Sequence, residues 1–142
     1  MIILDTNVVS EVMRPSPSAR VLRWLAAQRA GELFITTITQ AEILFGVELL
    51  PVGKRRVALQ SAVAAMLAED FAGRILPFDG DAAGMYARIA AERRALERPI
   101  SQLDAQVAAI ARSRGAAVAS RNASDFEHCG VAVIDPWRGR SP

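Results

Sequence analysis

The sequence predicts an α/β domain with a central, mostly parallel β-sheet and helices on both of its faces. Short apolar runs rich in β-branched residues alternate along the chain with longer amphipathic segments, which is the pattern of strands connected by helices. The length of 142 residues and the hydrophobic fraction of 51% fit a single globular domain, residues 1–142, with a sizeable core.

Short apolar runs provide the expected strands. The first run ends in a carboxylate, Asp5, and is too short and too β-branched to be a helix. The expected strands cover residues 2–5, 33–36, 74–78, 116–120 and 131–135.

Longer periodic segments between these runs provide the expected helices. Ser16 or Ser18 can cap the second helix, Pro51 ends the third, and Gly115 follows the last helix, where a left-handed cap favours glycine. The expected helices cover residues 6–13, 19–28, 39–50, 54–71, 79–96 and 101–115.

Several acids have local explanations when each is considered alone. Glu42 follows Thr39 by three residues, and Asp104 follows Ser101 by three, so both pairs have the spacing of a helix capping box. Asp5 can likewise cap the helix that follows it.

Taken together, the acids indicate a different role. Asp5 follows the first strand, and Arg121, Asn122 and Asp125 follow the fourth, at the edge where α/β sheets bind ligands. Carboxylates gathered at one place repel one another and require a compensating cation. Hard divalent cations such as Mg²⁺ prefer oxygen ligands, so a metal site is predicted here.

Other kinds of site are excluded or disfavoured by composition. His128 and Cys129 are the sole His and Cys, so an intrachain disulfide cannot form, and both a zinc site and a His-based triad are disfavoured. The sequence contains neither a P-loop motif nor a dinucleotide-binding glycine motif.

The cationic residues are sixteen Arg and the single Lys54. Arginine binds phosphates bidentately, which suits nucleic acid, although codon usage in a GC-rich genome explains the same bias. The formal charge of +2 permits an anionic partner without requiring one. We expect a cytoplasmic protein without membrane contact, because no leader pattern and no apolar run of about 20 residues is present.

Four motifs, in this order, resemble a known family: "ILDTNVVSE" at the start, "TQAEILFG" around Glu42, "LDAQVAAIA" around Asp104, and "SRNASDF" near the end. Together they resemble the PIN-domain ribonuclease toxins of type II toxin–antitoxin pairs, of the VapC or FitB-like kind. The resemblance implies a three-layer α/β/α PIN-like domain with an Mg²⁺- or Mn²⁺-dependent endoribonuclease site at Asp5, Glu42 and Asp104. It also implies an RNA substrate, a homodimer, and inhibition by a VapB-like antitoxin.

The resemblance suggests specific roles for these residues. Asp5 and Asp104 are expected to bind the principal metal, and Glu42 to be a further ligand or to orient the attacking water. Thr6 and Asn7 are expected to hold Asp5 in place. Independently of the resemblance, Arg121, Arg138 and Arg140 are candidates for phosphate contacts, with ordinary solvated surface as the alternative.

One position departs from the family pattern. The family commonly has a fourth acid two residues after the polar residue that ends the fourth strand, and this chain has Asn122 there. Asp125 is the nearest acid and can substitute in part, so Asn122 and Asp125 are additional candidate ligands of a weaker second metal site.

The third helix is apolar nearly all round, which is typical of a helix that is covered on more than one side. Phe45 and Leu49 are therefore candidates for an antitoxin or dimer contact, with burial inside the monomer as the alternative. Two other functions remain open: a PIN-fold nuclease acting on another nucleic acid, and a catalytically weak binding module.

Overall fold

Five parallel strands form the sheet at the centre of the computed structural model, which describes residues 1–138. Their spatial order is β3-β2-β1-β4-β5, and every neighbouring pair is parallel, which confirms the predicted sheet. The strands are β1 Ile2–Leu4, β2 Leu33–Thr36, β3 Ile75–Leu76, β4 Ala117–Ala119 and β5 Val133–Ile134.

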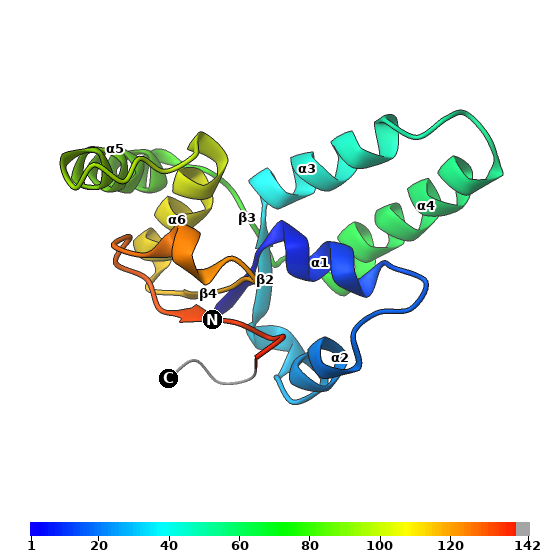
Figure 1. Ribbon diagram of the computed structural model, residues 1–142. Coiled ribbons are helices and arrows are strands. Elements are labelled where there is room, and N and C mark those ends of the chain that lie inside the picture. The colour runs from blue at the N-terminus through cyan, green and yellow to red at the C-terminus, as the bar shows by residue number, and fades with distance from the viewer. Residues whose placement is uncertain (139–142) are drawn as a thin grey trace.

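Helices cover both faces of this sheet, so the predicted three-layer α/β/α arrangement is confirmed (Figure 1). Helices α5 and α6 lie on one side, whereas α1, α2, α3 and α4 lie on the other. The helices are α1 Thr6–Val12, α2 Ala19–Ala26, α3 Thr37–Glu48, α4 Lys54–Ala65, α5 Gly80–Ala95 and α6 Gln102–Arg114. Short 3-10 helices cover Ala30–Glu32 and Ala123–Phe126, and a π-helical turn covers Met66–Asp70. No helix among the described residues is both long and apolar enough to cross a lipid bilayer.

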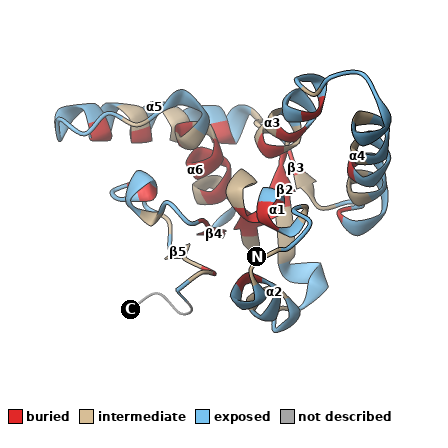
Figure 2. Ribbon diagram, turned by 45° about the vertical axis from the view of Figure 1, so that its right-hand side comes forward, coloured by how far each residue is buried: buried red, intermediate tan, exposed pale blue. Residues whose placement is uncertain are grey.

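The sheet has a separate hydrophobic core on each face because strand side chains alternate. Ile3 and Val118 pack with α5 and α6, whereas their neighbours Leu4 and Ala119 pack with α1, α3 and α4. Figure 2 shows the buried residues concentrated along the strands and on the helix faces that contact them. The alternation therefore determines which strand residues enter each core, and this requirement fixes the strand register.

The predicted caps are observed at the N-termini of two helices, and glycine closes one of these two helices at its C-terminus. Ser18 accepts a hydrogen bond from the Val21 amide at 3.4 Å, and Ser101 accepts one from the Asp104 amide at 3.2 Å. Gly115 has a left-handed backbone (φ 64°) directly after α6, as predicted.

The predicted capping box of the third helix is wrong. Helix α3 begins at Thr37, and its cap is Thr36, whose hydroxyl accepts the Thr39 amide at 3.1 Å. Thr36 is the last residue of β2 and is buried, so the helix starts as soon as the strand ends. Glu42 consequently lies in the second turn and is not a capping residue.

Most of the other elements are also shorter than predicted, among them β3, β5 and α4. β3 ends at Leu76 because Pro77 has no amide hydrogen to continue the ladder. β5 is limited to two residues paired with Val118 and Ala119 of the short strand β4. The long fourth helix changes at Met66 into the π-helical turn, closed by the Phe71 amide on the Met66 carbonyl at 3.0 Å.

A matched pair of substitutions on α4 tests the core. Val63 is 1% exposed, whereas Val57, on the same helix, is 60% exposed. We expect Val63→Ala to lower the free energy of unfolding by about 1.5–3 kcal/mol, because burial of the valine side chain is lost. Val57→Ala is expected to be neutral or slightly stabilising, since alanine has the higher helix propensity. Urea unfolding measures both, and equal losses would contradict this assignment of the core.

Candidate active site

Asp5 lies at the carboxyl end of the central strand β1 and is 7% exposed. Its amide donates to the Ala119 carbonyl at 2.9 Å, which continues the β1–β4 ladder by one residue. Its carboxylate accepts the Thr6 amide at 2.9 Å and the Ser120 hydroxyl at 2.8 Å. The cap and the candidate ligand are therefore the same side chain.

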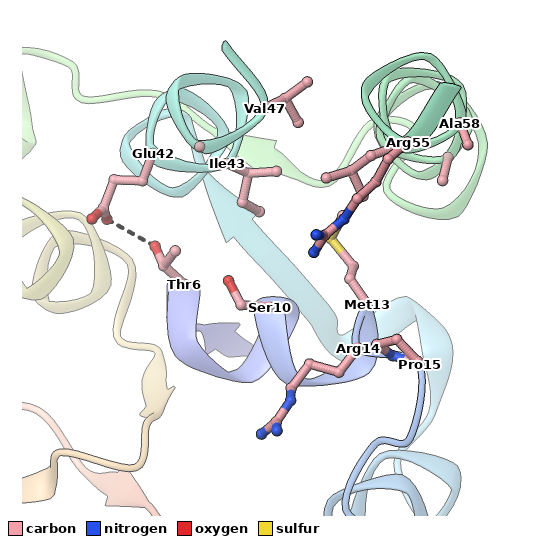
Figure 3. Close-up of a pocket in the computed structure, with 13 residues that line it drawn as sticks. Thr6, Ser10, Met13, Arg14, Pro15, Glu42, Ile43, Val47, Arg55 and Ala58 are labelled. Carbon is pink, nitrogen blue, oxygen red and sulfur yellow. Dashed lines mark hydrogen bonds between the residues drawn. The ribbon is translucent and has the colours of Figure 1, made fainter. Parts of the chain in front are cut away.

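Glu42 is brought to this edge by a contact between two helices. The Thr6 hydroxyl donates to Glu42 Oε1 at 2.8 Å (Figure 3) and lies 3.0 Å from the Thr39 hydroxyl. Thr6 was predicted to hold Asp5 in place, and its backbone amide donates to the Asp5 carboxylate. Its hydroxyl in addition fixes the position of Glu42 relative to β1.

Asp104 reaches the same region from the first turn of α6, where Ser101 caps the helix. It is partly buried, and Asp125 on the loop after β4 lies near enough to raise its pKa. Asp104 in turn raises the pKa of Asp5, as Glu42 does. The four acids therefore lie within electrostatic reach of their neighbours.

Ser120 connects several of these groups, and the sequence prediction did not include it among the site residues. It is buried, donates to Asp5, and accepts the Asn7 side-chain amide at 3.2 Å and the Asn122 backbone amide at 3.1 Å. Asn7 also lies 3.4 Å from Asp5 and accepts the Arg121 amide at 3.2 Å. A polar residue at the end of the apolar run "AAVAS" was the available signal for Ser120.

Burial dominates the electrostatics of the acids. Desolvation raises the pKa of Asp5 above its ordinary value, and the hydrogen bonds from Ser120 and Thr6 only partly oppose this. Desolvation also raises the pKa of Asp104, against a hydrogen bond from Ser101 and the positive charge of Arg93. Asp5 and Asp104 are therefore harder to ionise here than in water, because they lose hydration on burial and lie near other acids.

The donor set fits a hard divalent cation. The converging side chains offer carboxylate and hydroxyl oxygens, whereas the Cys129 thiol is buried against Arg93. Within residues 1–138, no three carboxylate, imidazole or thiol groups lie close enough to hold one ion by direct contact. Mg²⁺ is commonly bound through one or two carboxylates and several waters, which such spacing accommodates.

The predicted phosphate-binding arginines differ in position. Arg121 follows Ser120 directly, its backbone amide is held by Asn7, and its guanidinium lies over the Trp137 ring at 5.1 Å. Arg138 is highly exposed and lies 3.8 Å from Asp135, with no contact to the acids. Arg140 lies outside the described residues.

A groove of about 570 Å³ begins at Thr6 and Glu42 and runs between α1, α3 and α4. Ile43, Gly46 and Val47 line its α3 side, and Arg14 and Arg55 lie farther along it (Figure 3). Phe45 and Leu49 do not line this groove. They are 64% and 68% exposed on another face of α3, so burial inside the monomer, the alternative for these two residues, is excluded.

Comparison with known proteins identifies the family. Residues 2–131 match the family model described as PIN domain. The VapC ribonuclease Y4jK of Sinorhizobium fredii is 41% identical, over 96% of this chain and 98% of the relative. Toxin FitB of Neisseria gonorrhoeae is 39% identical, over 96% and 99%, and the crystal structure of FitAcB from that organism superposes with a TM-score of 0.92. A member of the VapBC family of toxin–antitoxin systems from Mycobacterium tuberculosis gives a TM-score of 0.63 at 25% identity, over 93% of this chain and 95% of that one.

The raised pKa of Asp5 predicts how stability depends on pH. A group whose pKa is higher in the folded state stabilises the fold less as pH rises from the unfolded value toward the folded one. In chelator at neutral pH we therefore expect Asp5→Asn to raise the melting temperature. The gain should shrink as pH falls and disappear below the ordinary value of 3.8, where Asp5 is protonated in both states.

The control is Asp81→Asn, which removes an exposed carboxylate from the first turn of α5. That charge favours the helix dipole, so this change should lower the melting temperature slightly. A lower melting temperature for Asp5→Asn at neutral pH would contradict the prediction that the ionised Asp5 carboxylate destabilises the fold.

Proposed function

The chain belongs to the PIN-domain family, among its VapC- and FitB-like members, and from this membership we propose that it is an Mg²⁺- or Mn²⁺-dependent endoribonuclease. In this proposal it is the toxin of a type II toxin–antitoxin pair and acts on RNA in the cytoplasm. The observation that carries the proposal is the convergence of Asp5, Glu42 and Asp104 at one edge of the sheet, with Glu42 tied to the strand end through Thr6.

Asp5 and Asp104 are the proposed metal-binding carboxylates. Their raised pKa values mean that a cation between them relieves both desolvation and mutual repulsion. When bound, the metal would lower the pKa of a water molecule and neutralise charge on the scissile phosphate. Hydrogen bonds from Ser120, Thr6 and Asn7 keep the Asp5 carboxylate in one orientation at the edge of the sheet.

Glu42 is the proposed group that orients and deprotonates the attacking water. Only one hydrogen bond to its carboxylate is present among the described residues, from Thr6 to Oε1, so Oε2 remains available to accept a proton. Asp125 is proposed to supply the fourth negative charge in place of Asn122, whose side chain carries none. This arrangement supports a strong principal metal site and a weaker second one.

Arg121 is the best supported of the three phosphate-binding candidates. Its backbone is fixed by Asn7 and its guanidinium by the Trp137 ring, and Arg20 in turn donates to the Trp137 carbonyl at 3.0 Å. An arginine that directly follows Ser120 at this edge of the sheet can bind a phosphate next to the scissile one. Arg138 and Arg140 are proposed to add contacts farther along the RNA.

The two faces of α3 suit two different partners. The groove along Ile43 and Val47 is mostly apolar, and we propose that it binds an apolar segment of the antitoxin, which would also cover Glu42. Phe45 and Leu49 are four residues apart and form one exposed apolar stripe, which we propose as the homodimer contact.

Two glutamates on α3 provide a matched test of the nuclease proposal. Glu42→Gln keeps the shape of the side chain but removes the proton acceptor, so RNA cleavage in Mg²⁺ or Mn²⁺ should fall by about 10²–10⁴-fold. Glu48→Gln, on the same helix but exposed, should cleave at the wild-type rate. Chelator should abolish cleavage by the wild-type chain.

Cleavage of RNA by Glu42→Gln at the wild-type rate would contradict the proposed role of Glu42. Absence of both specific divalent-ion binding and RNA cleavage would favour the binding module instead. Cleavage of DNA in preference to RNA would favour the other nuclease function.

A pair of leucines tests the dimer contact. Leu49→Asp places a charge in the proposed interface, so light scattering should report a monomer at concentrations where the wild-type chain is a dimer. Leu96→Asp alters an exposed leucine at the end of α5 and should remain dimeric. A dimeric Leu49→Asp variant would exclude this stripe as the interface.

A further inference from the structure

Arg93 is a buried cation for which the proposed reaction has no direct use. It lies in the last turn of α5 and is 7% exposed. Within residues 1–138, no carboxylate oxygen lies within 4.0 Å of its guanidinium, although seven other ion pairs are present. A buried charge is tolerated only where hydrogen bonds replace its hydration, so its partners indicate what it holds.

Those partners are mostly on one loop. Nη1 of Arg93 donates to the Asp125 carbonyl at 2.9 Å and to the Glu127 carbonyl at 2.8 Å, and lies 3.6 Å from Cys129 Sγ. Nε donates to the Arg98 carbonyl at 2.7 Å, so the segment just after α5 also holds the guanidinium in place. The arginine therefore connects α5 to the chain immediately after β4.

The same loop carries Asp125, whose negative charge raises the pKa of Asp104. Phe126 and Cys129 are buried and anchor the loop in the core, whereas the Asp125 side chain is exposed. The carbonyl of Asp125 points at Arg93, so its backbone cannot rotate freely. The 3-10 helix Ala123–Phe126 is thus fixed on both sides of the carboxylate that it presents.

We propose that Arg93 is a positioning residue, which clamps the loop after β4 so that Asp125 stands beside Asp104 as the fourth acid of the metal site. This inference rests on the proposed function, because it assigns a structural cause to one part of that site. Asn122 lies at the start of the same loop, where its backbone amide already binds Ser120. The clamp thus supplies, three residues later, the charge that position 122 lacks.

The position of Arg93 also balances charge. Asp125 raises the pKa of Asp104 while Arg93 lowers it, so the guanidinium lies near enough to offset the repulsion between the two acids. Lysine would retain this charge but cannot make the forked contacts with the Asp125, Glu127 and Arg98 carbonyls. Arg93→Lys therefore separates the clamp from the charge.

The test compares Arg93→Lys with Arg94→Lys, the neighbouring exposed arginine on the same helix. Amide hydrogen exchange in chelator follows residues 122–129, and calorimetric titration with Mn²⁺ gives the dissociation constant. We expect Arg93→Lys to speed exchange in this loop selectively and to weaken Mn²⁺ binding about tenfold or more, as loss of an outer support does. Arg94→Lys should change neither.

A double variant shows whether the effect passes through Asp125. Asp125→Asn alone should weaken Mn²⁺ binding about tenfold, and adding Arg93→Lys to it should cause no further loss. Because Asp125 is exposed, this single variant tests the acid even where Arg93→Lys folds poorly.

Three results would each overturn the role of Arg93. Arg93→Lys could leave amide exchange in the loop unchanged, or Asp125→Asn could leave Mn²⁺ binding unchanged. Arg93→Lys could also weaken Mn²⁺ binding equally in the wild-type chain and in Asp125→Asn. A wild-type chain that binds no Mn²⁺ would overturn the proposed function itself.

Discussion

The parallel register between β1 and β4 is the constraint on which the rest of the site depends. It pairs Leu4 with Ala119, so the next residues of the two strands, Asp5 and Ser120, meet at the carboxyl edge of the sheet. A slip of one residue would turn the strand side chains to the opposite face. The two hydrophobic cores prevent such a slip, because each requires its own set of alternate strand residues. Apolar burial thus holds together acids that repel one another.

The acids receive unequal support from the fold. Asp5 has a backbone amide, a hydroxyl and an amide side chain around it, and its strand is central. Glu42 depends on one hydroxyl and on the packing of α3, whose other surfaces are a groove and an exposed apolar stripe. A partner that binds either surface of α3 can therefore shift Glu42 while Asp5 stays in place.

Local features of the site could be predicted from the sequence, and contacts between distant segments could not. The carboxylate at the end of an apolar strand, the Ser101 cap and the left-handed Gly115 each depend on a few adjacent residues. The start of α3 was misplaced because "TTIT" contains three possible capping threonines, and burial at the end of β2 selects Thr36.

Arg93 and Ser120 were missed because their partners lie more than thirty and more than one hundred residues away. The composition of the third helix likewise could not separate its groove residues from its exposed stripe.

The hydrogen bond between Ser120 and Asp5 also has a consequence during synthesis, because it joins positions 115 residues apart. The chain leaves the ribosome from its N-terminus, so Asp5 and Glu42 emerge well before β4 has been made. A nascent chain therefore carries two of the acids without the strand that sets the position of the first. The nuclease edge is completed only late in translation, and the ribosomal RNA beside the growing chain faces an unfinished site.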